Sequence, residues 1–134
     1  MKLVIDTNKI IAALIKDGLS RQIITTPIFT FITPEYTLEE ISTYEAIIRK
    51  KGKLSKKEFD LLFALLFEHI MIIPKEEYNE FLPVSQTLIE DVDDVPFIAL
   101  CLAVKADGIW SDDTHFHTHQ KFIIFRTKDL ITLL

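Results

Sequence analysis

The feature that most constrains this 134-residue chain is a repeated alternation of short apolar runs with helix-patterned segments. The first run covers residues 3–5, and helical spacing of apolar residues begins soon after it, at Ile10. Four later runs have strand character, at residues 28–32, 70–73, 109–111 and 122–125. Strands joined by helices favour right-handed crossovers and a parallel sheet covered on both faces. We therefore expect one α/β domain over residues 1–134, in which helices flank a central parallel sheet of about five short strands in three layers.

Local start and stop signals place several helices. Ser55 and Glu58 form a capping-box pattern that opens a helix through residue 67. A longer helix is predicted from about residue 34, where a proline can occupy the first turn, to residue 51, with Gly52 as its cap. Asp94 has the pattern of an N-cap for a helix that ends near residue 106, and Thr127 is expected to cap a last helix that reaches residue 134.

Composition excludes several classes of protein. The 20 Asp and Glu outnumber the 15 Lys and Arg, and the net charge of -5 argues against unspecific attraction to nucleic acid or to an anionic membrane. Three glycines are too few for a P-loop or a dinucleotide fingerprint. The single Cys101 cannot form an internal disulfide, and no apolar run approaches the roughly 20 residues that span a bilayer. We expect a cytoplasmic protein without a membrane partner.

Acidic residues stand where parallel sheets bind ligands. Asp6 directly follows the first apolar run, and Asp112 and Asp113 follow the fourth. Because the carboxyl ends of parallel strands share one edge, side chains from distant segments can converge there. Further candidates are Glu39 and Glu40 after the second run, and Asp93 and Asp94 before the helix that leads into the fourth. Carboxylates without Cys or His partners suit Mg²⁺ or Mn²⁺ and indicate phosphoryl chemistry.

Four segments of the chain resemble the PIN-domain ribonucleases. They are VIDTN at residues 4–8, EEI at residues 39–41, DVPFIAL at residues 94–100 and IWSDDTHF at residues 109–116. The resemblance implies a divalent-metal-dependent ribonuclease that hydrolyses RNA phosphodiester bonds with four acids. Carried over by position, the four catalytic acids are Asp6, Glu40, Asp94 and Asp113.

The resemblance also suggests how these acids divide the work. It makes Asp6, Asp94 and Asp113 the metal ligands, with Asp112 as a further candidate ligand beside Asp113, while Glu40 orients the attacking water. Glu39 competes with Glu40, and Asp93 with Asp94, because each pair is adjacent in the chain. The supporting residues, which would orient ligands or water, are Thr7, Asn8 and Ser111.

Each acid also has a structural explanation. Asp94 fits a helix N-cap, Thr37 with Glu40 fits a capping box, and Asp112 with Asp113 fits a solvated turn. Taken singly, the structural explanation is at least as good as the catalytic one. The joint order of the acids along the chain favours the site.

Two polar segments remain open to interpretation. The basic stretch from residue 49 to 57 offers RNA backbone contacts through Arg49, Lys50, Lys51 and Lys53. Equally, bases at a helix C-terminus complement its dipole and keep a hairpin tip soluble. The alternating histidines 115, 117 and 119 fit a polar loop better than a transition-metal site, and one of them could contact RNA phosphate.

Several partners follow from the resemblance. RNA is the expected substrate, and the family includes toxins of toxin–antitoxin pairs, which implies a small antitoxin protein and a homodimer or higher homo-oligomer. A stand-alone RNA-processing enzyme is the alternative within the same class. A catalytically inactive PIN-like scaffold that binds RNA or protein is the alternative from a different class.

Overall fold

The computed structural model describes residues 1–117 and 122–134. Its five strands are all parallel and lie in the order β3-β2-β1-β4-β5. They are β1 (Lys2–Ile5), β2 (Thr30–Pro34), β3 (Ile70–Ile73), β4 (Gly108–Trp110) and β5 (Ile124–Phe125). The chain moves from β1 to β2 and β3 on one side, then returns to β4 and β5 on the other. The carboxyl ends of β1 and β4 therefore form the switch point at which such sheets bind ligands.

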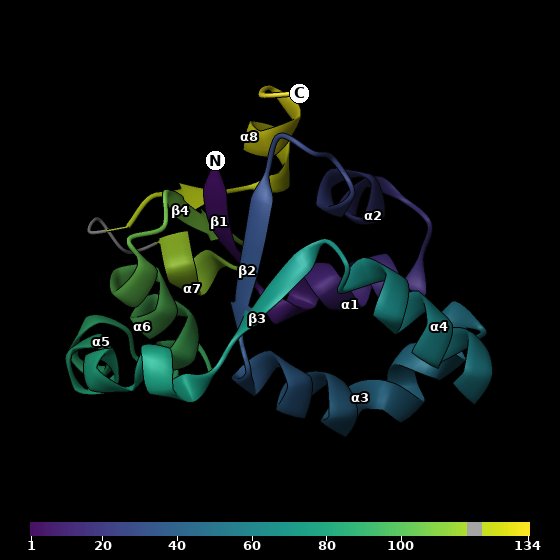
Figure 1. The fold of residues 1–134 in the computed structure, drawn as a ribbon, viewed down its shortest axis with the longest axis horizontal. Helices are drawn as coiled ribbons and strands as arrows, with labels where there is room; N and C mark the ends of the chain where they lie inside the picture. Colours follow the sequence, from purple (N-terminus) through teal and green to yellow (C-terminus); the bar gives the residue numbers. More distant parts are fainter. Residues whose placement is uncertain (118–121) are drawn as a thin grey trace.

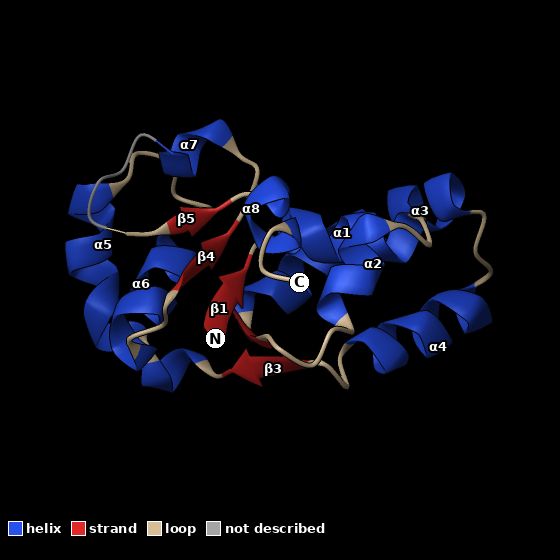
Figure 2. Cartoon of the chain, turned by 90° about the horizontal axis from the view of Figure 1, so that it is seen from above, coloured by secondary structure: helices blue, strands red, loops and turns tan. Residues whose placement is uncertain are grey.

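Helices cover both faces of this sheet, which confirms the predicted three-layer α/β fold. One group lies on one side of the strands in Figures 1 and 2, namely α1 (Thr7–Ile15), α2 (Leu19–Ile24), α3 (Tyr36–Gly52) and α4 (Lys56–Leu66). The opposite group is α5 (Leu82–Leu88), α6 (Val95–Val104) and the short α7 (Thr114–His117). The last helix, α8 (Thr127–Ile131), follows β5, and two 3₁₀ turns, Lys75–Glu77 and Asn79–Phe81, precede α5. In the described part of the chain, no helix is long and apolar enough to span a bilayer.

The core is split by the sheet into two apolar clusters. Leu3, Phe31 and Trp110 face the cluster shared with α1 to α4, whereas Val4 and Ile109 face the cluster shared with α6. This alternation follows from the period of two along a strand. Because both faces of β1 and β4 are covered, the residues after the exposed Lys2 and before Asp6 and Ser111 are apolar or glycine.

Several predicted boundaries were wrong. The helical spacing that begins at Ile10 predicted one helix, which Gly18 would end, but a second helix, α2, follows it and has Gly18 as its N-cap. The second strand lies two residues later than predicted because Ile28 is 50% exposed, whereas Thr33 and Pro34 are buried and belong to the strand. The N-cap of α8 is Arg126, whose N–H donates to the Asp129 carboxylate.

The end of α3 also differs from the prediction. Gly52 is the last helical residue, and Lys53 takes the left-handed cap conformation with φ 55°. A Cβ at Gly52 would lie 3.3 Å from the Cα of Ile15, so the glycine permits the close approach of α3 to α1. The predicted capping box of α4 is confirmed, since Ser55 and Glu58 exchange hydrogen bonds of 2.9 and 3.1 Å.

Candidate active site

Asp6 is the central acid of the candidate site. It directly follows β1, is 6% exposed, and is the N-cap of α1, where its Oδ1 accepts from the N–H of Asn8 at 3.5 Å. Its Oδ2 accepts a 2.7 Å hydrogen bond from the hydroxyl of Ser111. Burial raises the pKa of Asp6 and nearby Asp113 raises it further, against the lowering effect of these hydrogen bonds and of Lys9. Asp6 is thus a buried carboxylate whose charge is costly without a cation.

Ser111 connects Asp6 to the acid that follows β4. Its hydroxyl, fully buried, donates to Asp6 and accepts the N–H of Asp113 at 3.0 Å. The hydroxyl thus receives one bond and gives another, so the positions of the two acids depend on each other. Asn8 contributes its backbone N–H, and its side chain is exposed.

The two adjacent aspartates after β4 have different surroundings. The carboxylate of Asp112 accepts the N–H of Thr127 at 3.0 Å and its hydroxyl at 2.6 Å, at the start of α8. It also pairs with the ammonium group of Lys9, which lies 6.0 Å from the centre of the Trp110 ring. Burial works to raise the pKa of Asp112, but the bonds from Lys9 and Thr127 together lower it. Asp112 therefore ties α1, β4 and α8 together, whereas Asp113 shares the hydroxyl of Ser111 with Asp6.

Glu40 lies on α3, in the neighbourhood of Asp6. Its Oε1 accepts a 2.7 Å hydrogen bond from Thr7, the residue that follows Asp6. Burial raises the pKa of Glu40, the Thr7 bond lowers it, and the charges of Asp6, Asp93 and Asp91 raise it. Its neighbour Glu39 is exposed. The geometry therefore favours Glu40 over Glu39 as a site acid.

The expected capping box of Thr37 with Glu40 was wrong. The N-cap of α3 is Glu35, and Thr37 lies within the helix, fully buried. Its hydroxyl contacts those of Thr7 and Thr33 at 3.0 and 2.8 Å. The pattern that suggested a cap marks instead a polar connection beside the site.

Asp94 and Asp93 also separate in the structure. Asp94 is 8% exposed, whereas Asp93 is exposed and accepts a 2.6 Å hydrogen bond from the hydroxyl of Tyr36 at the start of α3. Asp94 occupies the N-cap position of α6, yet within the described residues its side chain accepts no capping hydrogen bond. The contact between Tyr36 and Asp93 brings the start of α6 next to the start of α3, the helix that carries Glu40.

The hydrogen bonds of Ser111 and Thr7 therefore link only some of the candidate acids to one another. Asp6, Asp113 and Glu40 are connected through Ser111 and Thr7, and Asp94 is a buried carboxylate at the start of α6. In residues 1–117 and 122–134, no three Cys, His, Asp or Glu side chains are arranged so that they could hold a metal ion together. The predicted histidine roles fall on His119 and on the side chains of His115 and His117, which lie outside the described residues.

The basic residues of the α3–α4 hairpin lie away from the acids. This hairpin projects from the sheet in Figures 1 and 2. Lys50, Lys51 and Lys53 are exposed, whereas Arg49 donates to the carbonyl of Leu54 and lies 3.8 Å from Glu45. At 1.5 Å per helical residue, Lys50 is about 15 Å further along α3 than Glu40.

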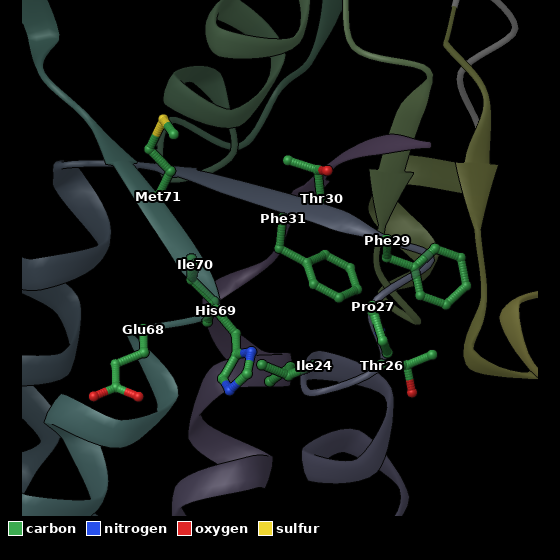
Figure 3. Close-up of a pocket in the computed structure, with 10 residues that line it drawn as sticks. All are labelled: Ile24, Thr26, Pro27, Phe29, Thr30, Phe31, Glu68, His69, Ile70 and Met71. Carbon is green, nitrogen blue, oxygen red and sulfur yellow. The ribbon is translucent and has the colours of Figure 1, made fainter.

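A separate pocket of about 410 Å³ lies at the amino ends of β2 and β3 (Figure 3). Phe29, Phe31 and Ile70 make its wall largely apolar, and Glu68 and His69 also line it. It is at the end of the sheet opposite to Asp6 and Asp113. The candidate acids are absent from its lining in the described part of the chain.

Sequence reasoning missed three contributors to the site. Lys9 bonds to Asp112, Thr127 bonds to Asp112, and Thr33 bonds to Ile5, so each contact crosses between elements that are separate in the chain. Lys9 lies three residues after Asp6 and therefore about one helical turn away from it. This spacing could have indicated that Lys9 lies near the site. Thr127 carried no such signal, because its partner is fixed by the pairing of β4 with β5.

Comparisons with known proteins agree with this architecture. A family model described as the PIN domain matches residues 4–123. No curated protein matches the chain. Among solved structures, the chain is similar to one described as VapBC2 from Rickettsia felis bound to a DNA fragment from their promoter, with 16% sequence identity and a TM-score of 0.63. The match covers 94% of this chain and 98% of that chain, and at this identity it shows a shared fold.

Proposed function

The chain belongs to the PIN-domain family, and on this premise we propose that it is a ribonuclease that hydrolyses RNA phosphodiester bonds with a divalent cation. The observation that carries the proposal is the pair of carboxylates at the switch point of the sheet. Asp6 follows β1 and its carboxylate accepts the hydroxyl of Ser111, while Asp113 follows β4 and its backbone N–H donates to that same hydroxyl. Ligand sites of open parallel sheets lie at this position.

The chemistry of these side chains suits Mg²⁺ or Mn²⁺, and a cation would have to draw the carboxylates closer together than they lie in the described residues. Asp6 and Asp94 are almost completely buried, and the charge of Asp113 raises the pKa of Asp6 in addition to the effect of burial. A cation would relieve that repulsion, and carboxylate oxygens are the ligands that these hard ions prefer. We propose Asp6, Asp94 and Asp113 as the residues that would hold it. When bound, the cation would neutralise charge on the phosphodiester and activate water.

The chain's own residues would then position the reactants. Ser111 holds the Asp6 carboxylate and the backbone of Asp113 in a fixed relation. Glu40, bonded through Oε1 to Thr7, would orient the attacking water and accept its proton. We propose that Asp112 supports Asp113 from outside the ligand set, since Lys9 and Thr127 engage its carboxylate.

We also propose that the hairpin tip contacts the RNA backbone. Lys50, Lys51 and Lys53 are exposed, and a single strand that reaches them from Glu40 would run about 15–20 Å along α3. Arg49 would act mainly through the fold, because it also bonds the carbonyl of Leu54. Such contacts position the substrate and are independent of base sequence.

The biological role that we propose is that of a toxin with a small antitoxin partner. The support is the shared fold with a chain of a structure described as VapBC2 bound to promoter DNA. The same role would make the protein a cytoplasmic homodimer or higher homo-oligomer that acts on RNA. Co-expression with the gene product encoded beside it, followed by size-exclusion chromatography, tests both the partner and the oligomeric state.

Cleavage of labelled single-stranded RNA in Mn²⁺ tests the ribonuclease proposal. We expect the parent chain to cut, and Asp6→Asn, Asp94→Asn and Asp113→Asn each to cut at least about a hundredfold more slowly. Asp17→Asn is the matched control, because the Asp17 side chain is 81% exposed. Equal cutting by all variants, or none by a folded parent on a panel of RNAs, would contradict the proposal. Calorimetric titration with Mn²⁺ separates an enzyme from an inactive scaffold, which would have no need of the cation.

A further inference from the structure

Three buried threonines form a chain of hydroxyl groups that ends at Glu40. Thr7 donates to Glu40 Oε1 at 2.7 Å, and its oxygen lies 3.0 Å from that of Thr37. Thr37 lies 2.8 Å from Thr33, whose hydroxyl in turn reaches the carbonyl of Ile5 at 3.2 Å. The threonines are 0–3% exposed and come from α1, α3 and β2.

The number of protons in this chain limits its arrangements. Each hydroxyl has one proton, so three protons serve four contacts when Glu40 is ionised. All three hydroxyls can then point toward the carboxylate, with Thr33 donating to Thr37, Thr37 to Thr7, and Thr7 to Glu40. The contact given up is the longest one, from Thr33 to the Ile5 carbonyl. Hydrogen bonds between aligned hydroxyls polarise one another, which strengthens the last bond of the chain, from Thr7 to the Glu40 carboxylate.

A proton on Oε1 of Glu40 permits the reverse arrangement. Glu40 then donates to Thr7, and the direction continues through Thr37 and Thr33 to the Ile5 carbonyl, so that all four contacts become hydrogen bonds. Burial, opposed by the Thr7 bond, raises the pKa of Glu40, and the charges of Asp6, Asp93 and Asp91 act in the same direction as burial. The chain can therefore anchor Oε1 whether Glu40 is ionised or neutral.

We propose that Thr33 and Thr37 are positioning residues, which keep the Thr7 hydroxyl on Oε1 of Glu40 and so leave Oε2 to meet the water that attacks the phosphodiester. This inference rests on the proposed ribonuclease function. During the reaction the proton from water would pass to Oε2, while the bond between Thr7 and Oε1 stays in place. Glu40 would therefore gain a proton without losing its anchor.

The chain is not a path that carries protons to solvent. Its far end is the carbonyl oxygen of Ile5, the last residue of the central strand β1, which has 0% exposure. A carbonyl in a β-strand accepts a hydrogen bond but passes no proton on. The hydroxyls thus act by orientation alone.

Stability by itself does not require these hydroxyls. Replacing both partners of a buried hydrogen bond with apolar groups of similar shape is close to neutral, and sometimes stabilising. Valine at positions 33 and 37 would fill nearly the same volume and would remove both partners of the bond between Thr33 and Thr37 together, while Thr7 keeps its bond to Glu40. The double substitution Thr33→Val with Thr37→Val therefore separates a positioning role from a structural one.

Steady-state RNA cleavage in Mn²⁺ provides the first test. We expect the double valine variant to lower kcat by about tenfold with KM within about twofold of the parent and an unchanged or higher melting temperature. Thr37→Ser, which keeps the hydroxyl, should retain the parent kcat. In a Glu40→Gln background, the double valine change should have less than about a twofold further effect. Parent-like kcat in the double variant, or a full tenfold loss that persists in Glu40→Gln, would overturn the inference.

A second measurement is independent of activity. In metal-free protein, carboxyl carbon NMR of labelled glutamate follows the titration of Glu40. Removing the aligned donors should raise its pKa in the double valine variant, whereas Thr43→Val should not, because the Thr43 hydroxyl donates to the Glu39 carbonyl on the exposed side of α3. If the parent cuts no RNA, the ribonuclease proposal fails, but this titration still tests whether Thr33 and Thr37 support the bond between Thr7 and Glu40. An unchanged Glu40 titration in the double variant would overturn the inference.

Discussion

Ser111 donates a 2.7 Å hydrogen bond to the carboxylate of Asp6, although the two residues are 105 positions apart in the chain. The bond joins the carboxyl ends of β1 and β4, where the N–H of Asp6 also donates to the carbonyl of Trp110 at 3.1 Å. Because Ser111 also accepts the N–H of Asp113, the placement of both acids depends on one buried hydroxyl. A change at Ser111 should therefore affect both acids at once.

Ser111→Ala should weaken both folding and catalysis. Loss of the buried hydroxyl removes a donor from Asp6 and an acceptor from Asp113, which should cost about 1–3 kcal/mol of unfolding free energy. It should also raise the pKa of Asp6, because a hydrogen bond to the ionised form is lost, so the pH at which activity rises should shift upward. Urea denaturation and a pH–rate profile measure these effects, with Ser42→Ala on the exposed side of α3 as the control. A pH profile identical to that of the parent would contradict the prediction.

The two adjacent aspartates should respond oppositely to substitution. Asp113→Asn should lower cleavage by about a hundredfold or more with little effect on stability. Asp112→Asn should retain cleavage within a few-fold but lose about 1 kcal/mol of stability, since Lys9 loses its charged partner and α8 loses part of its capping. Thermal denaturation beside the cleavage assay distinguishes them. The reverse pattern would make Asp112 the ligand.

The unfolding free energy of the metal-free protein should depend on pH through the titration of Asp6. Its pKa in the folded state lies above the unfolded value of 3.8, so the folded state holds the proton more tightly. Stability should therefore fall as pH rises from about 3.8 to the raised pKa, and then level off. Asp6→Asn has no carboxyl group to titrate at this position, so its stability relative to the parent should increase as pH rises over the same range. Urea titrations in EDTA at a series of pH values measure the difference, and a difference that does not change with pH would refute the assignment.

Gly108→Ala should disrupt the pairing of β4 with β5. A Cβ at this position would lie 2.4 Å from the carbonyl oxygen of Ile123 and 2.7 Å from a ring carbon of Phe125. Backbone must move to accept it, and we expect a loss of about 1–3 kcal/mol. Gly18→Ala is the matched control, because its Cβ would meet only side-chain carbons of Lys16 at 3.6 Å or more. Equal melting temperatures for the two variants would contradict the prediction.

Neutralising the hairpin tip should weaken RNA binding without altering the chemistry. The triple variant Lys50→Gln, Lys51→Gln and Lys53→Gln should raise KM at low salt and leave kcat unchanged. Each lysine that no longer neutralises a phosphate should reduce the salt dependence of log K by about 0.7. The control is the same change at three exposed lysines elsewhere, Lys2, Lys75 and Lys128. If both triple variants bind RNA equally, the tip has no special role.

The sheet and its switch point could be predicted from the sequence because apolar runs change abruptly to acids. Asp6 and Asp113 each follow such a run, and the parallel order of the strands brings their ends to one edge. Helix α2 escaped prediction because Gly18 acts as the N-cap of a helix that has only two buried residues, Ile23 and Ile24. A glycine there indicated only the end of the helix before it.

The different surroundings of neighbouring acids could not be predicted. Asp112 differs from Asp113 because of Thr127 and Lys9, which lie 15 and 103 positions away and meet it only after the sheet has formed. Thr37 had a local explanation as a cap, and that explanation failed because the true N-cap is Glu35. Adjacent residues of the same type carry no local signal that separates them, so tertiary contacts decide their roles.

The contact between Asp112 and Thr127 also affects where the protein can be shortened. The family match ends at residue 123, and α8 begins at Thr127. A chain cut after residue 123 would retain every matched position and all four candidate acids, yet it would lose the hydroxyl and N–H that hold the residue next to Asp113. Trp110 would lose a partner as well, since its indole N–H donates to the Thr127 hydroxyl at 3.1 Å. The smallest segment recognisable as the family is therefore shorter than the smallest segment that keeps the carboxyl end of β4 in place.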